Sequence, residues 1–495
     1  MFTVALTLAC GLNGVIGVAS MPDDWPQFRG PGGRGVAAPA TFPTAINVEH
    51  PAWRTPLPDG ISSPCVLGEH VFVTGHEGTS LLTICLDRAT GKERWRASVQ
   101  VEDLERHHEL NNAASSTTAV DGERVVAFFG SFGLVAYDHD GKELWQRRLP
   151  RERNIFGNAV SPILHEGRVV FLHDSQESSS LETIDAATGE TVWSVDRTGF
   201  RSGWSTPTIV ERDGRQEILV YGVWWLVAYD LASGIERWRA PGLTDEPITT
   251  PVKAGDLILV TSYNMKTNPE VEGLPTFAEL LAELDADESG SLDAEEVAHN
   301  KSVLSRHDAD GEGDHPLRIF LRQMDRDRDG EVTASEWQRI VDWVDGFAHA
   351  NGLVALRPPA SVERATGGND GPQAEVVWSY PRGVPECPSP VVIEDRVFMV
   401  KNGGLATYLV AATGELVWQD RTGARGPCYA SPVVADGKIY TCSARGVLTI
   451  LATSDESRVL SHVEFGERIL ATPALAGGRL FVRTDAALYA FDAED

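Results

Sequence analysis

The sequence of 495 residues is poor in cysteine and in positive charge. Its six cysteines include no adjacent pair, no Cys-x-x-Cys and no Cys-x-x-Cys-His, so thiolate metal sites and covalently attached haem find no support. Lys and Arg number 43 against 71 Asp and Glu, which gives a formal net charge of −28. An acidic surface repels nucleic-acid phosphates, and we therefore expect no nucleic-acid partner.

Long apolar runs are also missing after residue 20, so we expect no membrane-spanning helix. Residues 1–20 are apolar and small and end in Val18-Ala19-Ser20, the pattern of a signal peptide, although no Lys or Arg precedes the apolar run. We predict a periplasmic or secreted protein. Cys10 follows Thr7-Leu8-Ala9, a poor lipoprotein motif, so lipid anchoring at Cys10 stays an open alternative.

An eleven-residue phrase, AYDLASGIERW at residues 228–238, recurs along the chain. It predicts the end of one strand, a tight turn at Ser233 and Gly234, and a return strand that ends on a large aromatic. Near copies end at Trp95, Trp145, Trp193 and Trp418, and looser copies end at Trp378 and pass through residues 448–463. Such recurrence predicts a repeat architecture.

Each repeat begins with Ser or Thr, usually followed by Pro, and continues through two short strands joined by a hairpin turn. With the two strands of the Trp phrase, a repeat holds four strands in about 46 residues, the size of a propeller blade. Eight such starts are present, at Ser63, Ser116, Ser161, Thr206, Thr250, Ser389, Ser431 and Thr472.

The two ends of the chain each carry an incomplete repeat. Trp53 lies in a strand with no partner before it, and the last repeat stops at Ala490-Phe491-Asp492 without its Trp strand. We predict that the two ends pair in one blade, which leaves no open edge in the ring.

The AxDxxTGxxxW phrase resembles the repeat of the pyrroloquinoline quinone (PQQ)-type eight-bladed propellers, which include quinoprotein alcohol dehydrogenases and the assembly lipoprotein BamB. The segment WPQFRGP, residues 25–31, is similar to the opening of secreted PQQ-like propellers. The resemblance implies an all-β, eight-bladed β-propeller. We expect an N-terminal arm in residues 21–50, blades 1 to 5 in residues 51–264, and blades 5 to 8 in residues 351–495.

Residues 265–350, called the insertion below, interrupt the fifth repeat between its second and third strands and carry 21 acidic and 8 basic residues. Two segments, 285–296 and 325–336, resemble EF-hand loops, in which clustered oxygen ligands hold calcium. Residues 277–284, 317–324 and 337–344 show apolar helical spacing beside the loops. We predict a small α-helical EF-hand pair with two Ca²⁺ sites. The candidate ligands are Asp285, Asp287, Ser289, Ser291, Asp293 and Glu296 in the first loop, and Asp325, Asp327, Asp329, Glu331, Thr333 and Glu336 in the second.

The loops that enter the first strands of the blades should share one face with the insertion, because chain direction alternates along antiparallel strands. We call the mouth that they line the funnel. It could bind an acidic or quinone-like ligand, and ordinary loop packing is the alternative. Its candidate residues are His107, His108, Asn111, Asn112, Arg153, Asn158, Arg201, Trp204, Glu386, Arg425, Tyr429 and Arg468.

The quinoprotein dehydrogenases that the chain resembles hold PQQ against a vicinal cysteine pair, which this sequence lacks. We therefore expect a monomeric, calcium-binding extracytoplasmic scaffold for a protein or small-molecule ligand, with a PQQ-dependent oxidoreductase as the alternative. Cys387 and Cys428 lie at equivalent places in neighbouring repeats, so both a disulfide and two buried thiols stay open.

Overall fold

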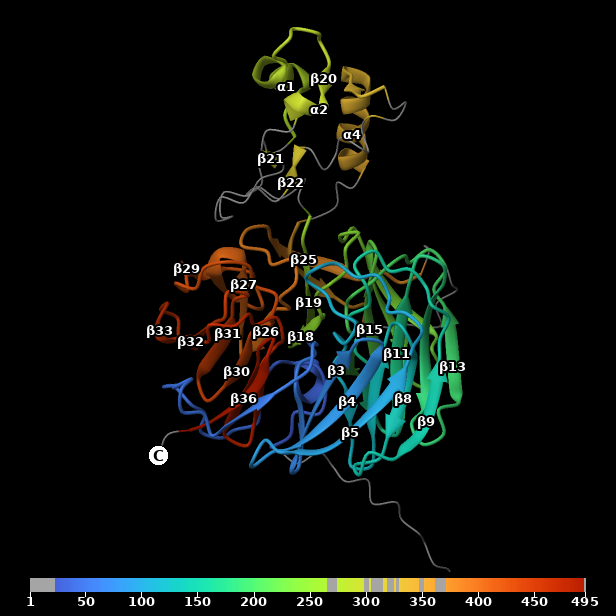
Figure 1. Ribbon diagram of the computed structural model, residues 1–495, viewed down its shortest axis with the longest axis vertical. Helices are drawn as coiled ribbons and strands as arrows, with labels where there is room; N and C mark the ends of the chain where they lie inside the picture. The colour runs from blue at the N-terminus through green and yellow to red at the C-terminus, as the bar shows by residue number, and fades with distance from the viewer. Residues whose placement is uncertain are drawn as a thin grey trace, which may run out of the picture.

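The structure is a computed structural model that describes residues 23–264, 274–297, 302–303, 315–317, 325, 329–346, 351–360 and 371–493. The expected signal peptide and Cys10 lie outside these ranges. Figure 1 shows a ring of sheets with a small helical body at one end. None of the helices within the described ranges is long and apolar enough to cross a membrane.

Eight four-stranded antiparallel sheets form the ring, which confirms the predicted all-β, eight-bladed propeller. The first strands of neighbouring blades contact one another, which places them innermost around the axis. Blade 1 consists of β2 (Cys65–Leu67), β3 (His70–Glu77), β4 (Ser80–Asp87) and β5 (Glu93–Gln100). Blade 2 consists of β6 (Ala119–Val120), β7 (Val125–Phe129), β8 (Gly133–Tyr137) and β9 (Glu143–Arg148). Blade 3 consists of β10 (Ile163–His165), β11 (Arg168–Asp174), β12 (Ser179–Asp185) and β13 (Thr191–Asp196).

The remaining blades repeat this order with two variations, in blades 5 and 8. Blade 4 consists of β14 (Thr208–Arg212), β15 (Arg215–Gly222), β16 (Trp225–Asp230) and β17 (Glu236–Pro241). Blade 5 consists of β18 (Val252–Ala254), β19 (Leu257–Ser262), β24 (Gly352–Arg357) and β25 (Glu375–Tyr380). Blade 6 consists of β26 (Val391–Ile393), β27 (Arg396–Lys401), β28 (Leu405–Val410) and β29 (Leu416–Arg421). Blade 7 consists of β30 (Val433–Ala435), β31 (Lys438–Cys442), β32 (Val447–Ala452) and β33 (Val459–Glu464). Blade 8 consists of β34 (Ala474–Ala476), β35 (Arg479–Arg483), β36 (Ala487–Asp492) and β1 (Trp53–Pro56).

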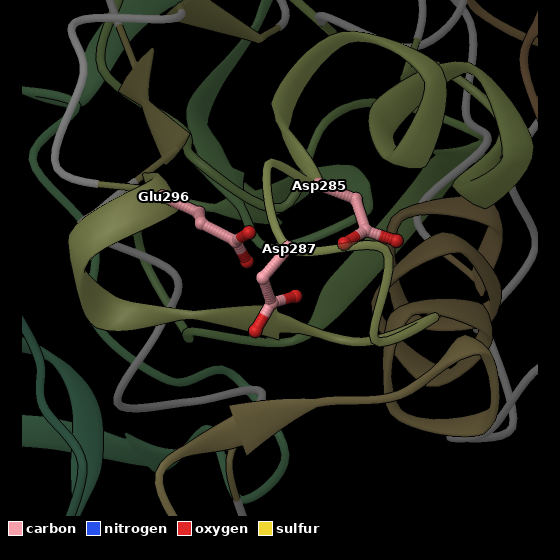
Figure 2. A group of neighbouring side chains, drawn as sticks. All are labelled: Asp285, Asp287 and Glu296. Atoms are coloured by element: carbon pink, nitrogen blue, oxygen red, sulfur yellow. The ribbon is translucent and has the colours of Figure 1, made fainter.

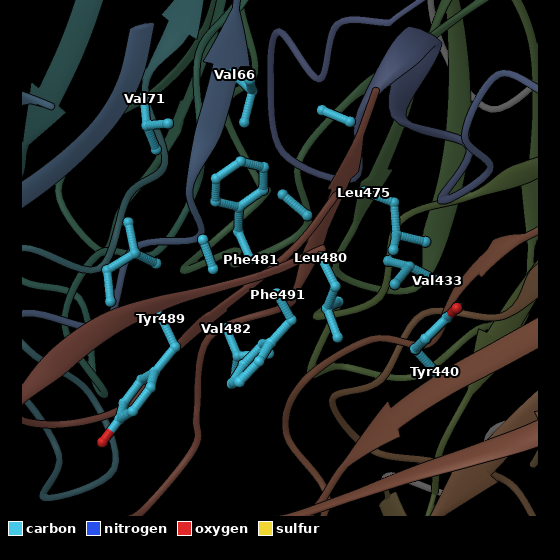
Figure 3. Close-up of a cluster of buried hydrophobic side chains, with 14 of the residues drawn as sticks. Val66, Val71, Val433, Tyr440, Leu475, Leu480, Phe481, Val482, Tyr489 and Phe491 are labelled. Carbon is cyan, nitrogen blue, oxygen red and sulfur yellow. The ribbon is translucent and has the colours of Figure 1, made fainter. Parts of the chain in front are cut away.

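Blade 8 joins the two ends of the chain, as predicted from the incomplete repeats. Strand β1 pairs antiparallel with β36, and Trp53 lies opposite Ala490. The largest apolar cluster of this region combines residues of blades 1, 7 and 8, among them Val66, Tyr440 and Phe481 (Figure 3). The junction of the two chain ends in blade 8 is therefore held by a continuous apolar core as well as by the pairing of β1 with β36.

The indole N–H of a Trp phrase bonds to the next blade at Trp95, Trp145, Trp193 and Trp418, whereas that of Trp238 bonds to Glu217 of its own blade. Trp145 of blade 2 lies beside the turn between β12 and β13, where its indole Nε1–H donates to the Ala186 carbonyl at 2.9 Å. Gly189 in that turn has φ +76°, and a Cβ there would lie 2.8 Å from the Trp145 ring. The Asp185 carboxylate holds the same turn by accepting backbone N–H groups from Ala187 and Thr188. The recurring Asp, Gly and Trp thus form one docking joint.

The N-terminal arm covers the free edges of several innermost strands. Trp25 pairs with Val66 of blade 1, the Val120 N–H of blade 2 donates to the Pro26 carbonyl at 2.8 Å, and Val36 pairs with Val434 of blade 7. The short 3-10 helix η1 (Pro31–Gly33) lies against β14 of blade 4. Residues 25–36 of the arm therefore lie along the innermost strands, and the arm then passes Tyr440 of β31, whose hydroxyl donates to the Pro43 carbonyl at 2.8 Å.

The insertion leaves blade 5 between β19 and β24 and carries the α-helices that the structure describes. These are α1 (Phe277–Leu284), α2 (Ala294–Val297) and α4 (Ala334–Gly346), with the short strand pairs β20 (Leu292–Asp293) with β23 (Glu331–Val332) and β21 (Ser302–Val303) with β22 (His315–Pro316). A capping box formed by Thr276 and Glu279 starts α1. The small apolar core of the insertion contains Leu280, Leu292, Val332, Trp337 and Ile340.

Candidate functional site

The first loop of the insertion brings three carboxylates together. One oxygen from each of Asp285, Asp287 and Glu296 lies within 4.8 Å of the other two (Figure 2). The three residues occupy positions 1, 3 and 12 of the predicted loop, where an EF-hand supplies its charged calcium ligands. Hard cations such as Ca²⁺ prefer oxygen ligands of this kind.

Backbone N–H groups fix the orientation of these carboxylates. Asp285 accepts from Ser289 and Gly290 at 3.0 Å each, and Glu296 accepts from Ala286 at 2.7 Å and from Asp293 at 3.0 Å. Gly290 turns the chain at φ +82°, as position 6 of the loop requires. The loop is therefore folded around the site by its own backbone.

The remaining predicted ligands of this loop make local contacts. The Asp293 carboxylate accepts the backbone N–H groups of Glu295 and Glu296 and so caps the start of α2. The Ser289 hydroxyl donates to the Ser291 carbonyl at 3.2 Å. The Ser291 hydroxyl donates to Glu331 of the second loop at 2.8 Å, which ties the two loops together.

The second loop shows the same design in the part that the structure describes. Gly330 has φ +90° and donates its N–H to Asp325 Oδ2 at 3.2 Å. Asp325 Oδ1 is buried and has no hydrogen-bond partner among the described residues. A bound cation would satisfy such an orphan carboxylate oxygen.

The structure also describes Asp329, Glu331, Thr333 and Glu336 of the second loop. Glu336 is buried and accepts from the N–H and the hydroxyl of Thr333 at 3.0 and 2.9 Å. Asp329 accepts the Glu331 N–H at 2.9 Å. Asp327 lies outside the described residues, as do Phe320, Leu321 and Met324 of the predicted preceding helix.

Strands β20 and β23 pair the two loops. Leu292 lies opposite Val332 in an antiparallel register, as the equivalent positions of two EF-hand loops predict. Trp337 packs beneath this pair, and its Nε1–H donates to the Pro275 carbonyl at 2.9 Å. The two loops thus form one unit, and ordering one of them helps to order the other.

The insertion leaves the ring on the funnel face. The Asn264 N–H donates to Asn351 Oδ1 at 3.0 Å, which closes the two strands that connect the insertion to blade 5. Asn351 Nδ2 in turn donates to the Pro381 carbonyl at 2.8 Å. Pro381 begins the loop that enters blade 6 and carries Glu386, so the insertion leaves blade 5 beside this predicted funnel loop.

Several predicted funnel residues hold neighbouring loops together. Asn111 Nδ2 donates to the Phe156 carbonyl, Asn158 Nδ2 donates to buried Glu105 at 2.6 Å, and the Trp204 Nε1–H donates to the Gly157 carbonyl at 2.9 Å. Asn112 Oδ1 accepts the Ala114 N–H within its own loop. These side chains give the funnel a fixed wall.

The other predicted funnel residues differ in exposure. Arg153 is exposed and pairs with Glu177 at 3.4 Å, and Arg468 pairs with Asp485 at 2.9 Å. Glu386 and Tyr429 are half-buried, and His107, His108, Arg201 and Arg425 are exposed. The four predicted funnel arginines therefore lie on separate loops, and the described contacts do not bring them together.

Sequence reasoning missed Glu246, in the loop that enters blade 5. The Glu246 side chain is exposed, but crowding by the surrounding loops desolvates its carboxyl, and together with the neighbouring carboxylates of Asp245 and Glu386 this raises the pKa of Glu246 to about 7. This loop is fixed by the Trp204 N–H, which donates to the Pro247 carbonyl at 3.0 Å. The Asp245-Glu246 pair was visible in the sequence, but its meeting with Glu386 depends on the ring.

None of the five cysteines that the structure describes forms a disulfide. Cys387 is half-buried and Cys428 is buried, so the structure matches the buried-thiol alternative rather than a disulfide between them. Burial raises the pKa of the Cys428 thiol to about 12. A thiol of this kind is protonated at neutral pH and is a poor nucleophile.

Comparison with known families identifies the propeller. A family model described as outer membrane protein assembly factor BamB matches residues 32–156, 84–266 and 409–495, more than half of the chain. This chain belongs to that family. A second model, described as EF hand, matches residues 317–341 of the BamB-family chain, which include the second loop.

Two relatives of this BamB-family chain are enzyme subunits. Methanol dehydrogenase [cytochrome c] subunit 1 of Methylorubrum extorquens is 27% identical over 178 residues, which cover 32% of this chain and 27% of the relative. The subunit of the same name from Methylobacterium organophilum is 27% identical over 175 residues, covering 32% of this chain and 26% of the relative. The match thus spans about a quarter of each relative.

Solved structures share the fold over nearly the whole chain. A europium-containing methanol dehydrogenase superimposes with a TM-score of 0.54 at 11% identity, covering 93% of this chain and 90% of that one. The quinohemoprotein alcohol dehydrogenase of Comamonas testosteroni has a TM-score of 0.54 at 12% identity, covering 96% of this chain and 82% of that one. At these identities the likeness concerns the fold alone.

Proposed function

We propose that this protein is a calcium-binding extracytoplasmic propeller that acts as a binding scaffold, with two Ca²⁺ ions in the insertion. The observation that carries the proposal is the meeting of Asp285, Asp287 and Glu296 within 4.8 Å of one another. Three carboxylates at this spacing repel one another unless a cation lies between them. The buried, unpartnered Asp325 Oδ1 supports a second ion in the second loop.

Each site would use the set of ligands that its loop predicts. Asp285, Asp287, Ser289, Asp293, Glu296 and the Ser291 carbonyl would hold the first ion, and Asp325, Asp327, Asp329, Thr333, Glu336 and the Glu331 carbonyl the second. Extracytoplasmic EF-hands commonly bind at roughly 10⁻⁴ to 10⁻³ M, so the ions serve structure rather than signalling. Bound calcium would hold the helices of the insertion against the paired strands β20 and β23.

Calorimetry with calcium tests this proposal on chelator-treated protein. Two sites are expected, with one left in Glu296→Gln and none in Glu296→Gln/Glu336→Gln. Glu295→Gln is the matched control, because Glu295 is exposed and its carboxylate lies outside the cluster. Calcium binding that survives the double substitution would refute the assignment.

The scaffold function rests on the funnel. Its loops are held to one another by Asn111, Asn158 and Trp204, so they offer a fixed surface to a protein or small-molecule partner. Membership of the BamB family supports this function and a periplasmic or secreted location. We further propose that the protein is a monomer, because blade 8 closes the ring within one chain.

A second candidate is a PQQ-dependent oxidoreductase, which the match to methanol dehydrogenase subunit 1 favours. PQQ supplies two-electron oxidation of alcohols when it is bound. The funnel does not fit the family's way of holding it, because no adjacent cysteine pair is present in the sequence. Trp204, the aromatic of the funnel wall, is buried, and its indole N–H is already bonded to Gly157.

Native mass spectrometry and absorbance of the calcium-loaded protein with PQQ separate the two candidates. A stoichiometric quinone adduct would favour the oxidoreductase. Free quinone at every protein concentration would leave the scaffold as the function. Glu296→Gln/Glu336→Gln is the control, since a funnel site should keep its quinone when the insertion loses calcium.

A further inference from the structure

Three arginines in the described part of the propeller are fully buried: Arg29, Arg197 and Arg483. A buried guanidinium is costly unless hydrogen bonds and an opposite charge offset the loss of water. The three arginines have different numbers of hydrogen bonds and nearby carboxylates, and Arg29 has the fewest.

Arg197 is fully satisfied by the protein, whereas Arg483 is satisfied only in part, because its Nε has no partner among the described residues. Arg197 makes a two-point pair with Asp174, in which Nε and Nη2 each donate at 2.9 Å, and its Nη1 donates to the Tyr229 hydroxyl at 2.6 Å. Arg483 Nη1 donates to the Ser62 hydroxyl at 2.7 Å and to the Thr74 carbonyl at 2.8 Å. Burial lowers the pKa of Arg483 to about 9, as it does for Arg29, but the carboxylates of Asp485 and Asp59 act in the opposite direction at Arg483.

Arg29 has far less. Its Nη2 donates to the Pro390 carbonyl at 2.5 Å, while Nε and Nη1 are buried with no partner among the described residues. Burial alone lowers the pKa of Arg29 to about 9, and no carboxylate in the described part of the chain offsets it. At neutral pH the side chain still carries its charge, so the fold holds a cation without a visible counter-charge.

The position of Arg29 places this charge inside the ring. It lies on the arm between the residues that pair with Val66 of blade 1 and Val434 of blade 7. Its one acceptor, Pro390, directly precedes β26, the innermost strand of blade 6. A Cβ on Gly35 would lie 3.1 Å from Arg29 Nη2 and 3.2 Å from the Pro432 carbonyl, so the arm packs closely around the guanidinium. The neighbours that these contacts identify are backbone groups of the arm and of the residues that directly precede β26 and β30.

We propose that the propeller binds a small inorganic anion of the size of chloride at the unpaired N–H groups of Arg29. A monatomic anion accepts hydrogen bonds from any direction and supplies the missing charge without needing a long side chain to reach the axis. The bound anion would neutralise the guanidinium and hold the arm in place across the innermost strands. This site is independent of calcium and of the proposed funnel ligand.

Thermal unfolding of the full chain in sodium chloride or bromide, against sodium gluconate at equal ionic strength, tests the proposal. Gluconate is too large to replace a monatomic anion in a close-packed interior. The small anions should raise the Tm of the wild type by about 2 °C or more over gluconate. Arg29→Met should lose this difference, whereas Arg34→Met, an exposed residue of the same arm, should keep it.

A crystal soaked in bromide gives a second measurement that does not depend on a folded variant. We expect an anomalous peak within hydrogen-bond distance of the Arg29 guanidinium. Ordered water alone at that position would overturn the proposal. Equal Tm differences in wild type and Arg29→Met would overturn it as well.

Discussion

The Ser431 backbone N–H donates a hydrogen bond to Thr472 Oγ1 at 3.0 Å, joining the start of blade 7 to the start of blade 8. The same link recurs between other neighbouring blades, always from a backbone N–H to the hydroxyl of the next blade. The further members are Ser63 to Thr117, Thr117 to Ser161, Ser161 to Thr206, Thr250 to Ser389 and Ser389 to Ser431. A chain of buried hydroxyls thus connects the blades close to the axis.

We predict that Thr472→Val destabilises the protein by about 1–3 kcal/mol, because it leaves the buried Ser431 N–H without an acceptor. Thr250→Val is the matched control. Thr250 Oγ1 is buried and lacks a partner among the described residues, so removing that hydroxyl should be neutral or stabilising. Urea unfolding with calcium present measures both. Equal losses in the two variants would show that the hydroxyl link contributes nothing.

The docking joint of the Trp phrase makes a second prediction through two glycines. Gly189 and Gly167 both have positive φ, +76° and +74°, but only Gly189 would place a Cβ 2.8 Å from the Trp145 ring. Both alanine variants carry the strain of a left-handed residue, about 1–2 kcal/mol. Gly189→Ala should lose a further ~1–3 kcal/mol through the clash. Equilibrium unfolding of the two alanine variants measures this difference. Equal losses of stability would mean that the Trp145 ring and the turn accommodate the added methyl group without strain.

These joints show what the sequence could and could not predict. The Asp, Gly and Trp of each repeat lie within about eleven residues, so their shared spacing predicted strands, turns and blade number. The recurring Ser or Thr was recognised as the start of a repeat, but its acceptor role depends on a partner about one blade away. A contact between two blades joins residues that are far apart in the chain, so it leaves no pattern of spacing within one stretch of sequence.

The same distinction between local and long-range contacts applies to the candidate sites. The first calcium loop was predicted residue by residue, because Asp285, Asp287 and Glu296 lie in one twelve-residue segment. Glu246 was missed, since Glu386 is far away in the chain and approaches it only because blades 5 and 6 lie side by side. Arg29 was placed in an arm, but nothing in its neighbouring residues indicates that it is buried without a counter-charge.

Ring closure gives a third prediction. Deleting residues 52–57 removes β1, including the Trp53 Nε1–H that donates to the Arg88 carbonyl at 2.9 Å. The deletion exposes the edge of β36, and exposed strand edges associate with other chains. We expect a lower Tm and soluble oligomers or aggregates in light scattering. A truncated protein that is monomeric and as stable as the wild type would contradict closure through this strand.

The pH dependence of stability gives a fourth prediction, through Glu246. Its pKa is raised from an ordinary value of 4.5 to about 7 by partial desolvation and by the carboxylates of Asp245 and Glu386. Between these two values the folded protein keeps a proton that the unfolded chain releases. Stability from Glu246 is therefore fully present below about pH 4.5 and is lost as the pH rises to about 7.

Glu246→Gln stays neutral at every pH and cannot lose that contribution. Its Tm should equal that of the wild type near pH 4.5, exceed it progressively as the pH rises, and keep a constant advantage above about pH 7. Glu386→Gln removes one of the repelling charges, so it should shift the window toward lower pH without abolishing it. Parallel Tm curves for wild type and Glu246→Gln would mean that the three carboxylates do not interact, and that solvent screens the funnel face as it does an open surface.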